Sequence, residues 1–408
     1  MTEVIVASSQ TIRNLRSVPA SFRIAAFALL NTRSGTLSFV LPDGRTLKFV
    51  NDETGPDAIV IVHDYAFVKR ALAGGDVGFA EAYMDSQWST PNLTDVLRFF
   101  SANFETAGRL AVGGAVVRGI NMIRHMLGNR NSREGAKKNI MAHYDLGNDF
   151  YRLWLDPSMT YSSAMFENPN MSLEQGQIAK YKNICDRINA GPSSELLEIG
   201  CGWGGFAEYA AKHRGAKVTC LTISPSQREF ALERMHRQGL SEKVDIRLED
   251  YRDHHGKYDG VASIEMFEAV GESYWPSYFA KIFESLKQGG KAALQIITID
   301  DDLFPRYRKR VDFIQRHIFP GGMLPSEQRL KEEFQAAGLR HDGVTYFGQD
   351  YARTCHEWAR TFNDKWDQIR HFGFDEPFRR MWNFYLSYCE AGFMDGRINV
   401  GQFQVTRT

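Results

Sequence analysis

Cysteine is scarce in this sequence. The 408 residues include five cysteines, at positions 185, 201, 220, 355 and 389, and none belongs to a Cys-x-x-Cys pair. Disulfide-stabilised secreted domains and zinc sites need denser or more regularly spaced cysteines, so the sequence predicts reduced thiols in the cytoplasm. The 11 histidines form no His-Glu-x-x-His motif, and we therefore expect no metal site.

Long apolar runs and a net charge are also lacking. The longest apolar candidates, 22–30 and 110–117, are shorter than the ~18–20 residues that span a bilayer. The N-terminus does not show the basic, apolar and small-residue order of a secretion signal, which agrees with a cytoplasmic location. The 49 basic residues balance 49 acidic residues, so the sequence does not indicate a chain that coats nucleic acid.

The composition is that of a folded protein with more than one domain. Hydrophobic residues make up 43% and charged residues 24% of the chain, and 408 residues correspond to about two domains. Two alternating runs flank a Pro-Asp-Gly turn within 34–50, which predicts a β-hairpin. We expect a small α+β domain over residues 1–128 and a polar linker over 129–139.

Residues 106–142 carry a local excess of positive charge. Seven basic residues face one acid, Glu134, and apolar residues recur at 116, 120, 123 and 127. A basic amphipathic helix suits the surface of an anionic membrane. The same pattern also suits a helix that packs on its own core with a solvated basic face, so both interpretations remain open here.

Residues 140–408 alternate between strand and helix patterns. Strands are predicted at 195–199, 216–221, 244–248, 261–264 and 291–299, and helices at 206–213, 226–238 and 274–286. Such alternation predicts an α/β domain with a doubly wound, mainly parallel sheet.

A glycine turn follows the first of these strands, at 200–205 (Gly-Cys-Gly-Trp-Gly-Gly). A dinucleotide site needs an acid after the second strand, but 221–224 contains none. Acids stand instead at Glu198 and at Glu249 and Asp250. This placement favours S-adenosylmethionine, whose ribose hydroxyls and cationic sulfonium suit nearby carboxylates; a dinucleotide enzyme and a structural turn remain alternatives.

Several ordered motifs resemble those of the cyclopropane-fatty-acyl-phospholipid synthase family. They include 143–151, 155–164, the glycine turn, 221–227, 251–253, 266–271 and 318–322, with a weaker match at 78–85. The resemblance implies a class I methyltransferase domain over 140–408, preceded by a lipid-binding domain at 1–128. It implies methyl transfer from S-adenosylmethionine to the double bond of an unsaturated acyl chain of a membrane phospholipid, giving a cyclopropane ring.

The resemblance also implies a set of cofactor-binding residues. They lie in the loop before the glycine turn, in the turn, and at the ends of the following strands: Tyr161, Ser162, Gly200, Gly202, Trp203, Thr222, Ile223, Gln227, Glu249, Asp250 and Ile264. His143 lies near this set and is a candidate for a lid over the cofactor.

Family members hold a bicarbonate ion as the base that removes a proton. Carried over by position, its ligands here are Glu268, Tyr385, Ile297, Gln295 and Ser163. Gln295 replaces the family histidine and Ser163 the family cysteine. An amide still binds anions but cannot act as an acid or a base. We therefore expect bicarbonate to be retained, and as an alternative a different proton loss that gives a methylene or methyl-branched unsaturated acyl chain.

Partners and other function classes follow from the same resemblance. It implies peripheral contact with the inner face of the membrane, and it leaves a homodimer open. A small-molecule N- or O-methyltransferase on the same scaffold and a non-catalytic lipid-binding protein are the competing hypotheses.

Overall fold

The computed structural model describes residues 3–104, 106 and 146–408. The predicted basic helix beyond residue 106, the linker 129–139 and His143 lie outside the described residues. The chain forms two compact units: Met1–Gly128 with Lys309–Ile318 and Ile369–Asp395, and Asn129–Arg308 with Phe319–Gln368 and Gly396–Thr408. These two units are defined by packing. The predicted domains 1–128 and 140–408 with their linker are functional segments, and they stay a prediction.

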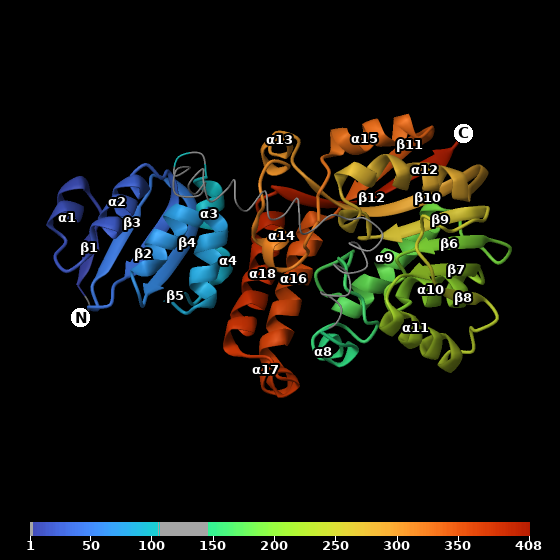
Figure 1. Ribbon diagram of the computed structural model, residues 1–408, viewed down its shortest axis with the longest axis horizontal. Coiled ribbons are helices and arrows are strands. Elements are labelled where there is room, and N and C mark those ends of the chain that lie inside the picture. The colour runs from blue at the N-terminus through green and yellow to red at the C-terminus, as the bar shows by residue number, and fades with distance from the viewer. Residues whose placement is uncertain (1–2, 105, 107–145) are drawn as a thin grey trace. The chain divides into compact units, whose positions relative to one another are not determined.

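The first unit contains a five-stranded sheet in the order β1-β3-β2-β4-β5 (Figure 1). The strands are β1 (Val4–Val6), β2 (Ser34–Val40), β3 (Thr46–Val50), β4 (Glu53–Val62) and β5 (Trp88–Ser89). β2 and β3 pair antiparallel around the Pro-Asp-Gly turn, which confirms the predicted hairpin. Gly44 allows this turn because its φ is +86°.

Helices complete the first unit, and three of them come from much later in the chain. The early helices are α1 (Ser9–Asn14), α2 (Ala20–Leu29), α3 (Ala66–Met84) and α4 (Leu93–Ala102), and the later ones are α14 (Phe313–His317), η4 (Arg370–Phe372) and α18 (Glu376–Met394). The Thr94 hydroxyl of α4 donates to Glu390 of α18 at 2.9 Å, and Arg98 pairs with Asp395 at 2.8 Å. The sequence pattern does not show that α18 belongs here, because amphipathicity reveals a buried face but not its partner.

The second unit is built on a seven-stranded sheet in the order β11-β12-β10-β9-β6-β7-β8. Its strands are β6 (Glu195–Ile199), β7 (Lys217–Thr222), β8 (Val244–Leu248), β9 (Tyr258–Ile264), β10 (Leu286–Ile299), β11 (Leu339–Tyr346) and β12 (Ile398–Arg407). The five from β10 to β8 run parallel, and β12 runs antiparallel to both of its neighbours. This confirms the doubly wound, mainly parallel α/β fold.

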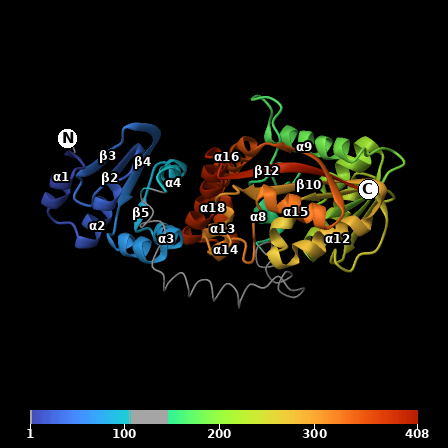
Figure 2. The ribbon, with the colours of Figure 1, turned by 90° about the horizontal axis from the view of Figure 1, so that it is seen from above.

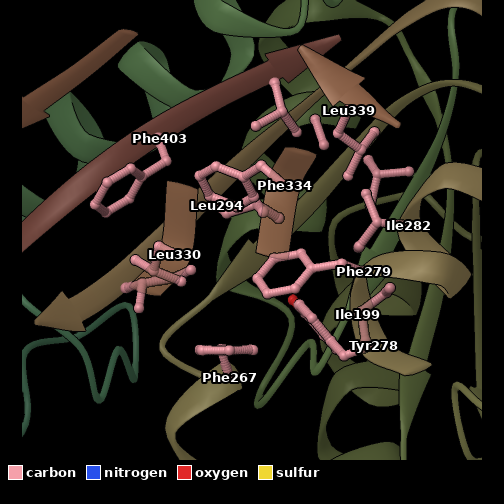
Figure 3. Close-up of a cluster of buried hydrophobic side chains, with 14 of the residues drawn as sticks. Ile199, Phe267, Tyr278, Phe279, Ile282, Leu294, Leu330, Phe334, Leu339 and Phe403 are labelled. Atoms are coloured by element: carbon pink, nitrogen blue, oxygen red, sulfur yellow. The ribbon is translucent and has the colours of Figure 1, made fainter. Parts of the chain in front are cut away.

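Helices cover both faces of this sheet. One core buries α9 (Leu173–Arg187), α10 (Gly205–Tyr209), the π-helix η1 (Ala210–Arg214) and α11 (Pro225–Arg237) against the strands. The opposite core buries α12 (Trp275–Ser285) and α15 (Glu327–Ala336), with Phe279, Ile282 and Phe334 at its centre (Figure 3). Figure 2 shows α9 on one side of β10 and β12, and α12 and α15 on the other.

Short helices connect the remaining segments of the chain. They are α8 (Asn148–Arg152), η2 (Phe267–Ala269), η3 (Glu272–Tyr274), α13 (Phe304–Tyr307) and α17 (Trp366–Ile369), with the longer α16 (Gly348–Asp364). Within the described ranges, no helix is both long and apolar enough to cross a bilayer.

The core of the second unit generates a stability prediction. Phe279 is fully buried and its ring packs edge-on against Phe334 at a centroid distance of 5.1 Å. Phe279→Ala leaves a cavity, and we expect it to lower the free energy of unfolding by ~3–5 kcal/mol. The control is Leu248→Ala on β8, where the side chain is 51% exposed. We expect this substitution to change the free energy of unfolding by less than about 1 kcal/mol. Chemical denaturation checks both values, and equal losses would contradict this account of the core.

Candidate active site

The glycine turn lies at the carboxyl end of β6 and is fastened to the end of β7. The backbone N–H groups of Gly200 and Cys201 both donate to the carbonyl of Leu221 at 3.0 Å. Gly200 and Gly202 have φ values of +81° and +52°. A Cβ on Gly200 would lie 2.6 Å from Cγ of Met266, whereas a Cβ on Gly202 would meet no atom within 4 Å. Gly202 therefore faces open space, as a ligand that approaches the backbone requires.

The other predicted cofactor residues gather at the same edge of the sheet. Thr222 ends β7 and donates to the Gln227 amide oxygen at 3.0 Å, while Ser224 caps α11. Trp203 is buried and its indole N–H donates to Asn148 at 2.8 Å. Ligands of open α/β sheets bind outside the carboxyl ends of the strands, so this edge fits S-adenosylmethionine.

The predicted acids after β8 already have partners within the protein. Asp250 accepts two hydrogen bonds from the Arg252 guanidinium, at 2.8 and 2.5 Å. Glu249 lies 3.1 Å from the His254 ring nitrogen Nδ1. Ile223 follows β7 directly, and Ile264 ends β9, opposite Gln295 of β10. The roles of these four residues toward adenosine stay predictions.

Tyr161 and Ser162 lie in a loop that α9 holds. The Gln177 amide donates to the carbonyl of Ser162 at 2.9 Å, and the Lys180 ammonium donates to its hydroxyl at 2.6 Å. Lys180 is fully buried. Burial lowers the pKa of Lys180 to about 7, although the negative charges of Glu265, Asp156 and Glu198 act to raise it.

Tyr161 belongs to a contiguous cluster of aromatic rings. Its ring lies 5.3 to 5.5 Å, centroid to centroid, from the rings of Tyr151, Trp154 and Trp358. Trp203 joins the cluster through Tyr151 at 5.0 Å. An aromatic wall beside the cofactor turn offers π faces to a cation and excludes water.

A carboxylate absent from the sequence prediction lies at the centre of the predicted catalytic residues. Glu265 directly follows β9, with a left-handed φ of +50°. Its Oε1 accepts from the Ser163 backbone N–H at 2.9 Å and from the Gln295 amide at 2.7 Å, and its Oε2 accepts from the Tyr351 hydroxyl at 2.5 Å. Burial raises its pKa, while Tyr351, Lys180, Gln295 and the Ser163 N–H oppose the rise.

Glu268 lies one turn further on, in η2. Its Oε1 accepts from the Ile297 backbone N–H at 2.6 Å. Its Oε2 is buried and has no hydrogen-bond partner among the described residues. Burial raises the pKa of Glu268 to about 8, and the negative charge of Glu265 adds to the rise.

The predicted bicarbonate ligands do not fit a bound anion in this structure. The N–H groups of Ser163 and Ile297 donate to Glu265 and Glu268 instead. The amide nitrogen of Gln295 donates to Glu265, and its amide oxygen accepts a hydrogen bond from Gln402 of β12 at 3.0 Å. Four predicted residues therefore come together, but they surround protein carboxylates rather than an anion pocket.

Tyr385, the fifth predicted catalytic residue, belongs to the first unit. It lies on α18, is 5% exposed, and packs edge-on against Trp382 at a centroid distance of 5.4 Å. Its role stays a prediction. In the described part of the chain, no three histidine, cysteine, aspartate or glutamate residues gather as a metal site would require.

Comparison with known proteins identifies the family. The family described as mycolic acid cyclopropane synthetase matches residues 131–403, which is more than half of the chain. The chain belongs to this family. It is thus an S-adenosylmethionine-dependent methyltransferase of the cyclopropane synthase type, as the motifs predicted.

Relatives of this cyclopropane synthase-type enzyme match nearly the whole chain. It is 37% identical over 385 residues to the tuberculostearic acid methyltransferase UfaA1 of Mycobacterium tuberculosis, covering 91% of this chain and 88% of that protein. It is 35% identical over 350 residues to the cyclopropane-fatty-acyl-phospholipid synthase of Escherichia coli K12, covering 84% and 86%.

Solved structures match about two thirds of the chain. The cyclopropane synthase MmaA2 of Mycobacterium tuberculosis gives a TM-score of 0.62 at 29% identity, covering 66% of this chain and 98% of that one. The mycolic acid cyclopropane synthase CmaA1, complexed with SAH and CTAB, gives 0.62 at 30% identity, with the same coverage of both chains.

Sequence reasoning missed Glu265, Lys180 and Tyr351. One signal for Glu265 was available: it is an acid placed directly after a parallel strand, at the edge where ligands bind. Lys180 and Tyr351 gave no such signal, because their partners are far away in the sequence.

The two glycines of the turn should respond differently to alanine. Gly200→Ala strains the backbone and collides with Met266, so we expect a loss of about 1–3 kcal/mol of stability. Gly202→Ala costs about 1 kcal/mol for its left-handed φ, but its methyl group enters the open space and should weaken S-adenosylmethionine binding at least tenfold. Thermal denaturation and titration calorimetry measure the two effects. Unchanged affinity in Gly202→Ala would place the cofactor elsewhere.

The raised pKa of Glu268 generates a pH prediction. The folded state keeps this proton up to about pH 8, whereas the unfolded chain releases it near the ordinary value of 4.5. The contribution of Glu268 to the free energy of unfolding therefore falls as the pH rises between these two values. Glu268→Gln removes this dependence, so its stability should fall less steeply from pH 5 to pH 8 than that of the wild type. Identical slopes in denaturation series at several pH values would contradict the prediction.

Proposed function

We propose that the enzyme transfers the methyl group of S-adenosylmethionine to the double bond of an unsaturated acyl chain in a membrane phospholipid, and that a cyclopropane ring results. The observation that carries this proposal is a pair of neighbouring, partly buried carboxylates, Glu265 and Glu268, which follow β9 at the carboxyl edge of the sheet. The names of the E. coli and M. tuberculosis relatives, which refer to phospholipid acyl chains and to a fatty acid, support a lipid substrate.

The chemistry of an alkene explains why such a site is needed. An alkene is a poor nucleophile, so water must be kept out and the chain held close to the electrophile. When bound, S-adenosylmethionine supplies an activated methyl group on a positively charged sulfur. Attack leaves a positive charge on the acyl chain, and a proton must then depart. A buried carboxylate beside apolar surroundings can accept that proton.

The aromatic cluster suits the positive charge that develops during transfer. The Tyr351 ring packs edge-on against Trp358 at 6.1 Å, and its hydroxyl binds Glu265. The rings and the carboxylate are therefore adjacent. Aromatic faces stabilise a cation without competing for it as a nucleophile.

The proposed substrate implies where the enzyme acts. A phospholipid acyl chain lies in a bilayer, so we place the enzyme at the inner face of the membrane as a peripheral protein, with a homodimer as the proposed assembly. Liposome co-sedimentation tests this placement: the protein should pellet with phospholipid vesicles. Recovery in the supernatant would instead support a small-molecule N- or O-methyltransferase.

A second candidate product is favoured by one specific observation. Ser163 and Gln295, two of the predicted bicarbonate ligands, donate to Glu265, and Ile297 donates to Glu268, which supports a proton acceptor other than that of the family pattern. Loss of a proton from the chain rather than from the methyl group would give a methyl-branched unsaturated acyl chain, and a hydride shift before proton loss from the methyl group would give a methylene acyl chain. The relative named as a tuberculostearic acid methyltransferase supports keeping this candidate.

Product analysis decides between these candidates. Purified enzyme is incubated with methyl-labelled S-adenosylmethionine and vesicles of a cis-unsaturated phospholipid, and the fatty acids are examined by mass spectrometry and NMR. We expect label in the acyl chain, with the ring protons of a cyclopropane at high field. Olefinic methylene signals would select the second candidate. Absence of labelled acyl chains, with the Gly202→Ala variant as background control, would refute methyl transfer to lipid.

A further inference from the structure

We propose that the side chain of Glu265 is the built-in proton acceptor of this enzyme and takes the place that a bound anion would have. This inference rests on the proposed methyl transfer to an acyl chain, and it holds for either product. Its foundation is that two predicted anion ligands, Ser163 and Gln295, both donate to one oxygen of Glu265.

The Glu265 carboxylate is held from several sides. Ser163 reaches it from the loop before α9, Gln295 from β10 and Tyr351 from α16. Gln402 of β12 fastens the far side of the Gln295 amide. A non-glycine residue with a φ of +50° is retained only where its surroundings determine it. The strained backbone and these hydrogen bonds together hold the Glu265 carboxylate in one fixed position.

The charges around Glu265 favour its ionised form over that of Glu268. Glu265 accepts three hydrogen bonds, and the Lys180 ammonium attracts it. Glu268 accepts a backbone hydrogen bond from Ile297, and its other oxygen is buried without a partner in the described chain. Two neighbouring buried carboxyl groups do not both ionise readily. The shared proton therefore resides on Glu268, and Glu265 remains free to accept another.

Lys180 does not act as an alternative acceptor. Its ammonium donates to the Ser162 hydroxyl, and the acids Glu265, Asp156 and Glu198 surround it. Glu198 is itself buried, and burial raises its pKa to about 8. Lys180 is thus a positioning residue that holds the 161–163 loop and adds positive charge near Glu265.

The proposed proton transfer balances as follows. The carbon–sulfur bond of the sulfonium breaks, and the methyl carbon bonds to one alkene carbon, which leaves the cation on the other carbon. Glu265 then removes a proton from the new methyl group, and that C–H electron pair forms the third bond of the ring. The neutral carboxyl group later gives its proton to water. For a methyl-branched unsaturated product, the same oxygen takes a proton from the chain, and the electron pair forms a C=C bond within the chain. For a methylene product, a hydride first shifts from the methyl-bearing carbon to the cationic carbon, the same oxygen then takes a proton from the methyl group, and that electron pair forms the C=CH2 bond.

Substitution and rescue test this proposal in the full-length enzyme. Glu265→Gln keeps the shape but cannot accept a proton, so we expect the rate of acyl methylation to fall ~100-fold or more while S-adenosylmethionine affinity changes less than threefold. Glu265→Ala opens a small space lined by the Ser163 N–H and the Gln295 amide. Bicarbonate or formate, added to carbonate-free buffer, should raise the rate of Glu265→Ala at least tenfold. Neither should affect the wild type or Glu265→Gln.

Matched controls separate this proposal from the proposed function. Glu242→Gln, at an exposed position, should retain wild-type activity. Circular dichroism and cofactor titration confirm that each variant is folded. If a variant is unfolded, the activity of the wild type with and without bicarbonate still tests the proposal. A wild type that needs bicarbonate for activity overturns it. An active Glu265→Gln also overturns it, whereas a wild type that methylates no lipid refutes the proposed function.

Discussion

Burying a carboxylate without losing its charge is the constraint on which the second unit depends. A buried anion is costly unless several donors compensate for the loss of water. Glu265 obtains this compensation from a backbone N–H, an amide and a phenol, which belong to a loop, a strand and a helix. The sheet, α9 and α16 must therefore be in place together before the charge is tolerated.

This constraint explains the polar residues at the interior of an otherwise apolar unit. Gln295, Gln402, Gln177 and Lys180 are all fully buried, and each forms a hydrogen bond that leads toward Glu265 or its loop. Connected buried hydrogen bonds of this kind favour one arrangement, although the side-chain oxygens of Gln177 and Gln402 have no hydrogen-bond partner among the described residues. The apolar cores on the two faces of the sheet provide stability, while this network sets the geometry between them.

Local pattern was sufficient to predict much of the fold. The predicted strand 244–248 coincides with β8, and the predicted helix 226–238 differs from α11 by one residue at each end, because periodicity and capping are local properties.

The network around Glu265 is not local. Its donors stand at 163, 295 and 351, and no spacing rule connects these positions. Gln295 was predicted as a bicarbonate ligand and donates to Glu265 in the structure; sequence alone does not distinguish the two partners, because an amide binds a protein carboxylate as readily as a free anion. The same limit applies to α18, whose contact with α3 and α4 spans most of the chain.

The position of β12 in the sheet has a consequence for the order of folding. This strand comes last among those described, yet it lies between β10 and β11, and its Gln402 supports a residue that precedes it by 107 positions. Pairings over such separations form slowly, because the loop between them must close first. The glycine turn makes its own hydrogen bonds to the end of β7 and does not use β12, whereas the Gln295 amide that holds Glu265 does. The two halves of the site therefore depend on pairings of different sequence separation.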